Sequence, residues 1–228
     1  MKKHGFTLIE LMVVMGLIAI LFVLAIPSFE NANRRDVNRP AQQFASALRL
    51  ARQAAIVRHQ WTFVVVPTRD GSFSRKNLDR CLHAYAVLAA TNMAGVRKST
   101  PYDKIKKEFV SDWKKLPDGV YFDENKNTKN NNAFKNPVKG SIDPANPNGT
   151  ANRLAVVAFK PDGQALCWNG NTWANDYISF YILSSRFYDV STSGNTLDDP
   201  TPLSTGATNQ IQISRQRGSA SIKNPNED

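Results

Sequence analysis

Apolar residues dominate the start of the chain and become periodic further along it. After a short basic head, an almost unbroken apolar run extends over residues 6–26 and is followed by Pro27. About twenty apolar residues are enough for one helix to cross a bilayer. The run holds one acid, Glu10, and a carboxylate inside hydrocarbon costs roughly 2.5 kcal/mol or more, which marks it as functional. We therefore predict a transmembrane segment over residues 6–27, in which Glu10 is paired with a partner.

A second helical pattern follows Pro27, which should kink the helix because proline removes a backbone hydrogen bond and clashes with the preceding turn. The apolar positions here recur at spacings of four, three and four: Phe44, Leu48, Ala51 and Ala55. This spacing is typical of a helix with one face on a core. Arg49 falls on the opposite face, where it meets solvent or a neighbouring subunit. Pro40 is a second candidate bend. We predict one long helix over residues 6–58, with an amphipathic continuation over residues 28–60.

From residue 61 the pattern becomes that of short strands separated by turns. The strands are expected at residues 61–66, 82–88, 120–122, 154–159, 165–168, 177–183 and 210–214. Residues 104–116 have apolar positions at helical spacing and are expected to form a short helix. Residues 124–152 and 184–209 are polar and are expected to be exposed insertions. A long helix followed by strands predicts an α+β fold, with the helix on one face of an antiparallel sheet.

Composition supports one anchored domain of ordinary size. With 228 residues and 42% hydrophobic content, the chain can build one core behind the anchor. We place this domain at residues 61–214 and a basic tail at residues 215–228. The formal net charge is +10, which suggests anionic partners such as DNA, phospholipid head groups or acidic proteins. Arg34, Arg35 and Arg39 follow the apolar run and can meet head groups or acids of neighbouring subunits.

The chain has two cysteines, Cys81 and Cys167. In an exported domain a disulfide between them is favoured. Such a bond would close a long loop and contribute about 4 kcal/mol to stability. Two buried free thiols are the alternative, because spacing along the chain does not place the two Cβ atoms near each other.

No arrangement of residues predicts catalysis. The histidines are His4, His59 and His83, and none has metal-ligand spacing with the cysteines. The sequence holds no phosphate-binding glycine loop and no nucleophile elbow. We therefore expect no catalytic residue, no metal site and no cofactor, and hence no enzyme. A membrane-tethered enzyme is a rival interpretation that no residue cluster supports.

The segment Gly5-Phe-Thr-Leu-Ile-Glu10 resembles the cleavage motif of type IV pilins and type II secretion pseudopilins. The resemblance implies that prepilin peptidase removes a leader of residues 1–5 after Gly5 and that the new N-terminal residue, Phe6, is methylated. Glu10 of one subunit would then pair with the Phe6 ammonium of a neighbour, offsetting the desolvation cost of both charges. The alternative is a secretory signal peptide, which needs small residues at its cleavage site; residues 25–29 offer only a weak one.

Residues 44–58 resemble the helix of the GspH/FimT group of minor pilins and pseudopilins, and residues 116–120, 159–163 and 211–215 follow that group's order. The resemblance implies a pilin-like fold, a single pass through the bacterial inner membrane and a periplasmic domain. It implies a subunit that assembles into, or initiates, a filament, with other pilins, the inner-membrane assembly platform and membrane lipid as partners. A type IV pilus and a type II secretion system are both compatible. The polar insertion and the basic tail favour the pilus slightly.

The end of the chain carries Arg215 and Arg217, with Lys223 beyond them. Arginine pairs suit bidentate contacts with phosphate. Members of the FimT branch are associated with DNA capture through a Gly-Arg-x-Arg element, and here Ser214 replaces the glycine. A DNA-binding minor pilin for DNA uptake in natural transformation is therefore the alternative function. The simpler interpretation is a solvated strand end.

Overall fold

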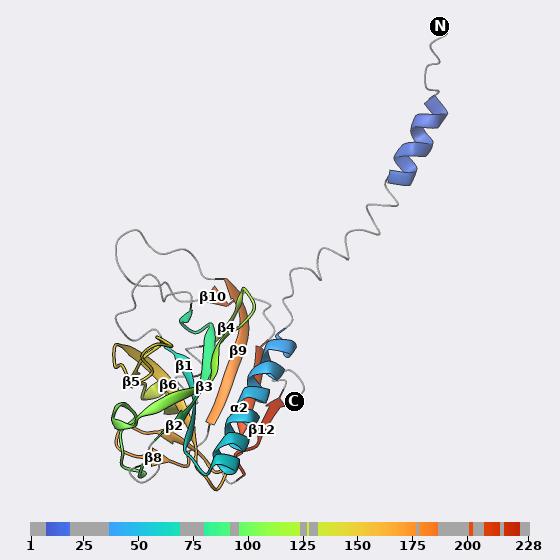
Figure 1. Cartoon of the computed structure of the whole chain (residues 1–228). Coiled ribbons are helices and arrows are strands. Elements are labelled where there is room, and N and C mark those ends of the chain that lie inside the picture. The colour runs from blue at the N-terminus through green and yellow to red at the C-terminus, as the bar shows by residue number, and fades with distance from the viewer. Residues whose placement is uncertain are drawn as a thin grey trace. The chain divides into compact units, whose positions relative to one another are not determined.

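The computed structural model describes residues 8–18, 37–68, 80–91, 96–123, 127, 132–176, 178–186, 201–202, 208–214 and 217–223. The chain divides into an N-terminal unit, Met1–Arg35, and a globular unit, Asp36–Asp228. The described part of the N-terminal unit is a helix over residues 8–18 (Figure 1). Within the described parts of the chain, no helix combines the length and the apolar character needed to cross a membrane. The predicted kink at Pro27 and the predicted continuous helix fall on residues 19–36, outside the described residues.

The globular unit begins with helix α2 (Asn38–Arg58), which ends at the residue that the sequence predicts. It buries the apolar stripe expected from the spacing: Phe44, Leu48, Ala51 and Ala55. Pro40 lies in the first turn, where the missing N–H of a proline is tolerated, so it starts the helix and does not bend it. His59 ends α2 in a left-handed conformation with φ of 52°, and its N–H reaches back to the Ala55 and Ile56 carbonyls.

The larger sheet has seven strands, all paired antiparallel, in the order β3-β2-β1-β6-β7-β8, with β5 also paired to β6. The strands are β1 (Thr62–Pro67), β2 (Ala84–Ala90), β3 (Lys107–Lys115), β5 (Val138–Gly140), β6 (Asn152–Phe159), β7 (Ala165–Trp168) and β8 (Trp173–Ala174). Val64 of β1 lies opposite Val87 of β2 and Val157 of β6. The β-branched and aromatic runs of the sequence therefore become the centre of the sheet, as expected.

The smaller sheet has five strands in the order β10-β9-β11-β12, with β4 also paired to β9. These are β4 (Val120–Phe122), β9 (Ile178–Arg186), β10 (Thr201–Pro202), β11 (Thr208–Ile213) and β12 (Ala220–Lys223). A 3-10 helix, η3 (Tyr102–Lys104), and a short helix, α4 (Asn132–Lys135), complete the described elements. The two sheets and α2 give the α+β fold that the sequence predicts.

One core lies beneath α2, which contacts strands of both sheets (Figure 1). At its centre the fully buried ring of Phe44 meets Tyr85 of β2, Phe122 of β4 and Phe180 of β9 edge-on, at centroid distances of 5.0, 4.9 and 4.9 Å. Each of these three residues belongs to a different strand. One helical side chain therefore joins α2 to both sheets.

A second core covers the opposite face of the larger sheet. Phe63 of β1 packs against Tyr102 of η3 and Trp173 of β8, and Leu154 of β6 is fully buried in the same cluster. Because successive residues of β1 face opposite cores, every residue of this strand is buried. The apolar runs of β1 and β2 are thus buried on both faces, where a one-sided sheet would alternate.

The prediction that residues 124–152 form an exposed polar insertion is wrong from residue 132 onwards. Residues 132–135 form α4 and residues 138–140 form β5 on the edge of β6. Phe134 packs on Phe122 and Phe180 in the first core, and Ile142 is buried in the second. A few apolar residues in a polar segment are enough to dock it, because the sheet offers two apolar faces.

The prediction of a short helix at residues 104–116 is also wrong, because this segment contains the end of η3 and strand β3. β3 pairs antiparallel with β2, and its register shifts twice, between Tyr85 and Val87 and between Val87 and Leu88. Such irregularities interrupt the alternation of inward and outward side chains. The apolar residues of β3 therefore fall at spacings that resemble those of a helix.

The predicted domain boundary at residue 214 changes as well. β12 pairs antiparallel with β11 and so adds a strand to the smaller sheet. The turn between them is closed by bonds from Ser214 N–H to the Ser219 carbonyl and from Gly218 N–H to the Ser214 carbonyl. Gly218 has φ of +61°, and a Cβ there would lie 2.2 Å from the Gly163 carbonyl oxygen. Part of the expected basic tail is thus folded against the domain.

Lys107 at the start of β3 is a buried ammonium with a complete set of contacts. Its Nζ donates hydrogen bonds to the Tyr102 and Ile105 carbonyls at 2.7 and 2.5 Å and lies 4.1 Å from the Tyr102 ring centroid. Burial lowers the pKa of Lys107 to about 8, although the negative charge of Asp103 opposes this shift. The ammonium holds the η3 loop against the second core.

This burial predicts that the globular unit becomes more stable as the pH rises from about 8 towards 9.5. The unfolded chain keeps its Lys107 proton up to the ordinary lysine pKa, whereas the folded chain releases it at a lower pH. The Lys107 contribution to the free energy of unfolding therefore rises by about 1–3 kcal/mol over this range. Burial also raises the pKa values of Cys167, Tyr85 and Tyr102, and ionisation of these groups in the unfolded chain favours unfolding; the thiol opposes the gain from about pH 9, and the tyrosines close the window near pH 10. Urea unfolding of wild type and Lys107→Met at several pH values measures the gain. An equal gain in the variant would contradict this role of Lys107.

Candidate assembly site

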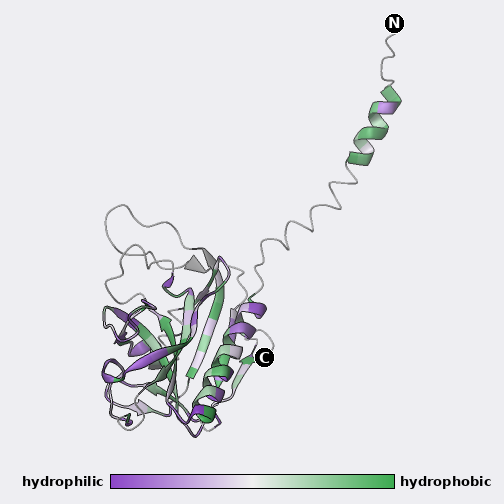
Figure 2. Cartoon of the chain, in the orientation of Figure 1, coloured by the Kyte–Doolittle hydropathy of each residue, from purple (hydrophilic) through white to green (hydrophobic). Residues whose placement is uncertain are grey.

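The helix over residues 8–18 presents an apolar surface on every side. Its large hydrophobic side chains are 44–78% exposed: Leu8, Ile9, Leu11, Met12, Val13, Val14, Met15, Leu17 and Ile18. Figure 2 shows this helix almost uniformly coloured as hydrophobic. A helix that is apolar all round is stable only when something apolar surrounds it, and an exposed patch of this size marks an interaction surface. The helix is therefore built to enter lipid or to pack against other apolar helices.

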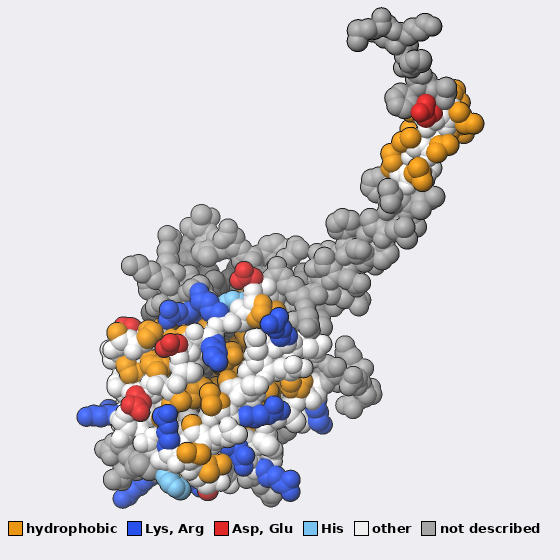
Figure 3. Space-filling model, turned by 45° about the vertical axis from the view of Figure 1, so that its right-hand side comes forward, with side chains coloured by type: hydrophobic (Ala, Val, Ile, Leu, Met, Phe, Trp, Pro, Cys, Tyr) orange, Lys and Arg blue, Asp and Glu red, His pale blue; other side chains and the backbone are white. Residues whose placement is uncertain are grey.

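Glu10 is the single acid of this helix, and it lies near its start. It is exposed among apolar neighbours. Figure 3 shows an acidic side chain, in red, beside hydrophobic side chains, in orange, on this helix. Once the helix is buried in an apolar environment, the carboxylate loses its hydration, and this desolvation costs free energy unless a cation pairs with it. Gly5 and Phe6 lie outside the described residues, so cleavage after Gly5 and the pairing of Glu10 with Phe6 stay predictions.

Of the three C-terminal cations, the structure describes Arg217 and Lys223. Arg217 is exposed in the β11–β12 turn, and Lys223 is exposed at the far end of β12. The intervening strand separates the two side chains. Arg215 lies outside the described residues. DNA binding by this group therefore stays a prediction.

Two arginines of α2 have partners within the chain that the sequence did not indicate. Arg49 donates to the Ala220 carbonyl of β12 at 3.1 Å, and Arg52 donates to the Gly163 carbonyl at 3.3 Å. Arg49 is exposed on the polar face of α2, as the sequence predicts. In addition, the two side chains fasten the helix to β12 and to the 160–164 turn. Their acceptors are backbone groups more than a hundred residues away, which no local pattern reveals.

The two cysteines are buried thiols that are not joined in a disulfide, contrary to the bond that the sequence favours. Cys167 lies opposite Val157 and hence at the level of Val64, whereas Leu82, next to Cys81, donates its N–H to the Pro67 carbonyl. The cysteines are therefore three strand spacings apart as well as three residues along the strands, and the strand spacings alone amount to roughly 14 Å. A disulfide requires Cα atoms within about 7 Å. Burial, with a contribution from Asp176, raises the pKa of Cys167 to about 12, so this thiol is unreactive.

Both described histidines serve the fold. His59 ends α2, and His83 places its Nδ1 2.9 Å from the Val120 carbonyl oxygen and its Nε2 3.9 Å from Asp118 Oδ1. Among the residues that the structure describes, no three His, Cys, Asp or Glu side chains gather closely enough to hold a metal ion.

Comparison with known proteins identifies the N-terminal segment. The model of the prokaryotic N-terminal methylation motif matches residues 1–26. The chain is similar to prepilin peptidase-dependent protein D of Escherichia coli (strain K12), with 59% identity over 34 residues. This match covers 15% of the chain and 23% of the relative, so the chain spans about a quarter of that protein's length. No solved structure matches the chain. In its N-terminal segment, the chain therefore carries a prepilin-type methylation motif and is similar to type IV pilin-like proteins and pseudopilins.

Proposed function

We propose that this protein is a minor pilin or pseudopilin of the GspH/FimT type, a structural subunit that assembles into, or initiates, a type IV pilus or type II secretion pseudopilus. The observation that carries the proposal is the helix over residues 8–18, which is apolar on every side apart from Glu10 and lies within the match to the methylation motif. Such a helix can exchange lipid for other subunits, because both surroundings are apolar. The role is structural and not catalytic.

The proposed life cycle follows from this helix. Residues 6–27 insert into the inner membrane in a single pass, with the globular unit in the periplasm. Prepilin peptidase removes residues 1–5 and Phe6 is methylated. The assembly platform then extracts the chain into a filament, where Glu10 pairs with Phe6 of a neighbouring pilin. Pairing supplies the cation that the carboxylate needs in an apolar environment.

The globular unit would serve as the surface that the filament displays. The two features that favoured the pilus were the polar insertion and the basic tail, and both are partly folded onto the sheets. Neither therefore distinguishes the pilus from the secretion machine. The DNA-uptake alternative gains no support from Arg217 and Lys223, because β12 separates them.

The test is incorporation of the full-length chain into filaments sheared from the cell surface or, for a pseudopilus, cross-linked in the envelope. Wild type is compared with Glu10→Val, and the amount in the membrane fraction serves as reference. Wild type should enter the filament fraction and the variant should remain in the membrane.

A further inference from the structure

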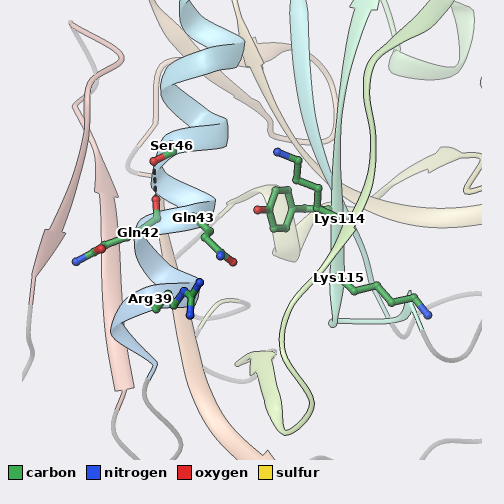
Figure 4. Close-up of a pocket in the computed structure, with 7 residues that line it drawn as sticks. Arg39, Gln42, Gln43, Ser46, Lys114 and Lys115 are labelled. Carbon is green, nitrogen blue, oxygen red and sulfur yellow. Dashed lines mark hydrogen bonds between the residues drawn. The ribbon is translucent and has the colours of Figure 1, made fainter.

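A basic groove lies between the first half of α2 and strands β2 and β3. It has a volume of about 670 Å³ and is lined by Arg39, Gln42, Gln43, Ser46, Tyr85, Lys114 and Lys115. Figure 4 shows Arg39 and Gln43 on α2 across from Lys114, whose ammonium turns towards the helix, and Lys115, which turns away. The lining holds three cations and no acid. The sequence did not reveal the groove, because residues 104–116 resembled a helix.

The groove is polar, which distinguishes it from the mostly apolar pockets that hold small ligands. The amides of Gln42 and Gln43 each offer both a donor and an acceptor. Ser46 donates its hydroxyl proton to the Gln42 carbonyl at 2.8 Å, so its oxygen can act only as an acceptor towards a ligand. Phosphate oxygens would have no use for these acceptors, because an ionised phosphate only accepts. A peptide backbone, which carries N–H and C=O groups in alternation, uses both kinds.

The neighbouring strand provides a further reason to expect a peptide. β3 stands at the end of the strand order, so its outer edge has no partner among the described strands. Exposed strand edges bind extended chains through backbone hydrogen bonds. Lys114 pairs in register with Tyr85 on the face of the sheet that carries the first core, which places its side chain on the same side as α2. An extended segment in the groove would therefore meet both Arg39 and Lys114.

We propose that this groove binds an acidic, extended peptide segment presented by a partner protein. Carboxylates of the segment pair with Arg39 and Lys114, and its backbone bonds to the glutamine amides. The identification of the partner as a neighbouring filament subunit rests on the proposed function. The binding of an acidic peptide by the groove is independent of the proposed function. The groove would then select which subunit sits beside this one, since charge complementarity governs partner choice more than affinity.

The test measures fluorescence anisotropy of a labelled hexaglutamate peptide with the full-length chain in a neutral detergent. Arg39→Gln combined with Lys114→Gln should weaken binding about tenfold, because two ion pairs are lost. The matched control is Lys135→Gln with Lys139→Gln, which removes the same charge from exposed positions on α4 and β5 outside the groove. Its affinity should stay within about twofold of wild type. Thermal unfolding of each variant checks that the fold is intact.

Four results would overturn the proposal. The first is no peptide binding by wild type, and the second is an equal loss of binding in both double variants. The third is displacement of the peptide by inorganic phosphate or a short DNA duplex at equal negative charge, which would show a general anion site. The fourth is groove-dependent binding to phosphatidylglycerol vesicles in place of the peptide. Because the assay uses the isolated chain, its failure leaves the incorporation test with Glu10→Val unaffected.

Discussion

Replacing Phe44 by alanine should lower the free energy of unfolding of the globular unit by about 3–5 kcal/mol. The ring is fully buried and touches Tyr85, Phe122 and Phe180 edge-on. These contacts belong to α2 and to both sheets, so the surrounding elements cannot close the cavity without moving against each other. Typical domains are stable by about 5–15 kcal/mol, and this single change removes a large part of that.

Urea unfolding followed by circular dichroism measures the loss. Phe44→Leu should cost less than alanine, because it leaves a smaller cavity. Leu50→Ala is the matched control on the same helix, since Leu50 is 44% exposed, and it should change stability by no more than about 0.5 kcal/mol. Similar losses for Phe44→Ala and Leu50→Ala would show that α2 does not dock through Phe44.

Glu10→Val should reduce incorporation into the filament about a hundredfold or more, while the amount in the membrane stays unchanged. Valine is apolar and leaves the membrane helix intact, so insertion is not affected. The Phe6 ammonium of the neighbouring subunit would lose its partner inside an apolar filament core. Breaking a buried ion pair costs about 3–5 kcal/mol, which corresponds to that factor or more.

Quantitative immunoblots of the filament and membrane fractions measure this effect. Glu10→Asp keeps the charge on a shorter side chain and should retain part of the incorporation. Leu11→Val is the control for a conservative change in the same exposed apolar surface and should behave as wild type. If Glu10→Val is incorporated as well as wild type, an ion pair between Glu10 and Phe6 is not needed for assembly.

The sequence predicted α2 and the central strands well because their patterns are local. The stripe of Phe44, Leu48 and Ala51 defines the buried face of α2, and the run of β-branched residues in β1 strongly favours a strand. The sequence predicts a helix in place of β3, because the irregular register of β3 with β2 disturbs the alternation of apolar and polar residues that is typical of a strand. The docking of Phe134 and the pairing of β12 depend on faces and edges that exist only in the folded chain.

The candidate site divides in the same way. The methylation motif and Glu10 could be recognised from contiguous residues, and the family comparison confirms the motif over residues 1–26. The groove could not be recognised, because Arg39 and Lys114 come from segments far apart in the sequence. The partners of Arg49 and Arg52 were hidden for the same reason, since both acceptors are distant backbone carbonyls. Cysteine pairing likewise depends on strand register.

The mass of the mature N-terminal peptide tests the central claim most directly. The protein is purified from the membranes of its own bacterium, with and without an active prepilin peptidase, and its N-terminal peptide is analysed by mass spectrometry. We predict a chain that begins at Phe6 with one methyl group on its amino nitrogen, and an intact Met1 leader when the peptidase is absent. A peptidase-independent N-terminus within residues 25–29 would instead show a secretory signal peptide and contradict the account.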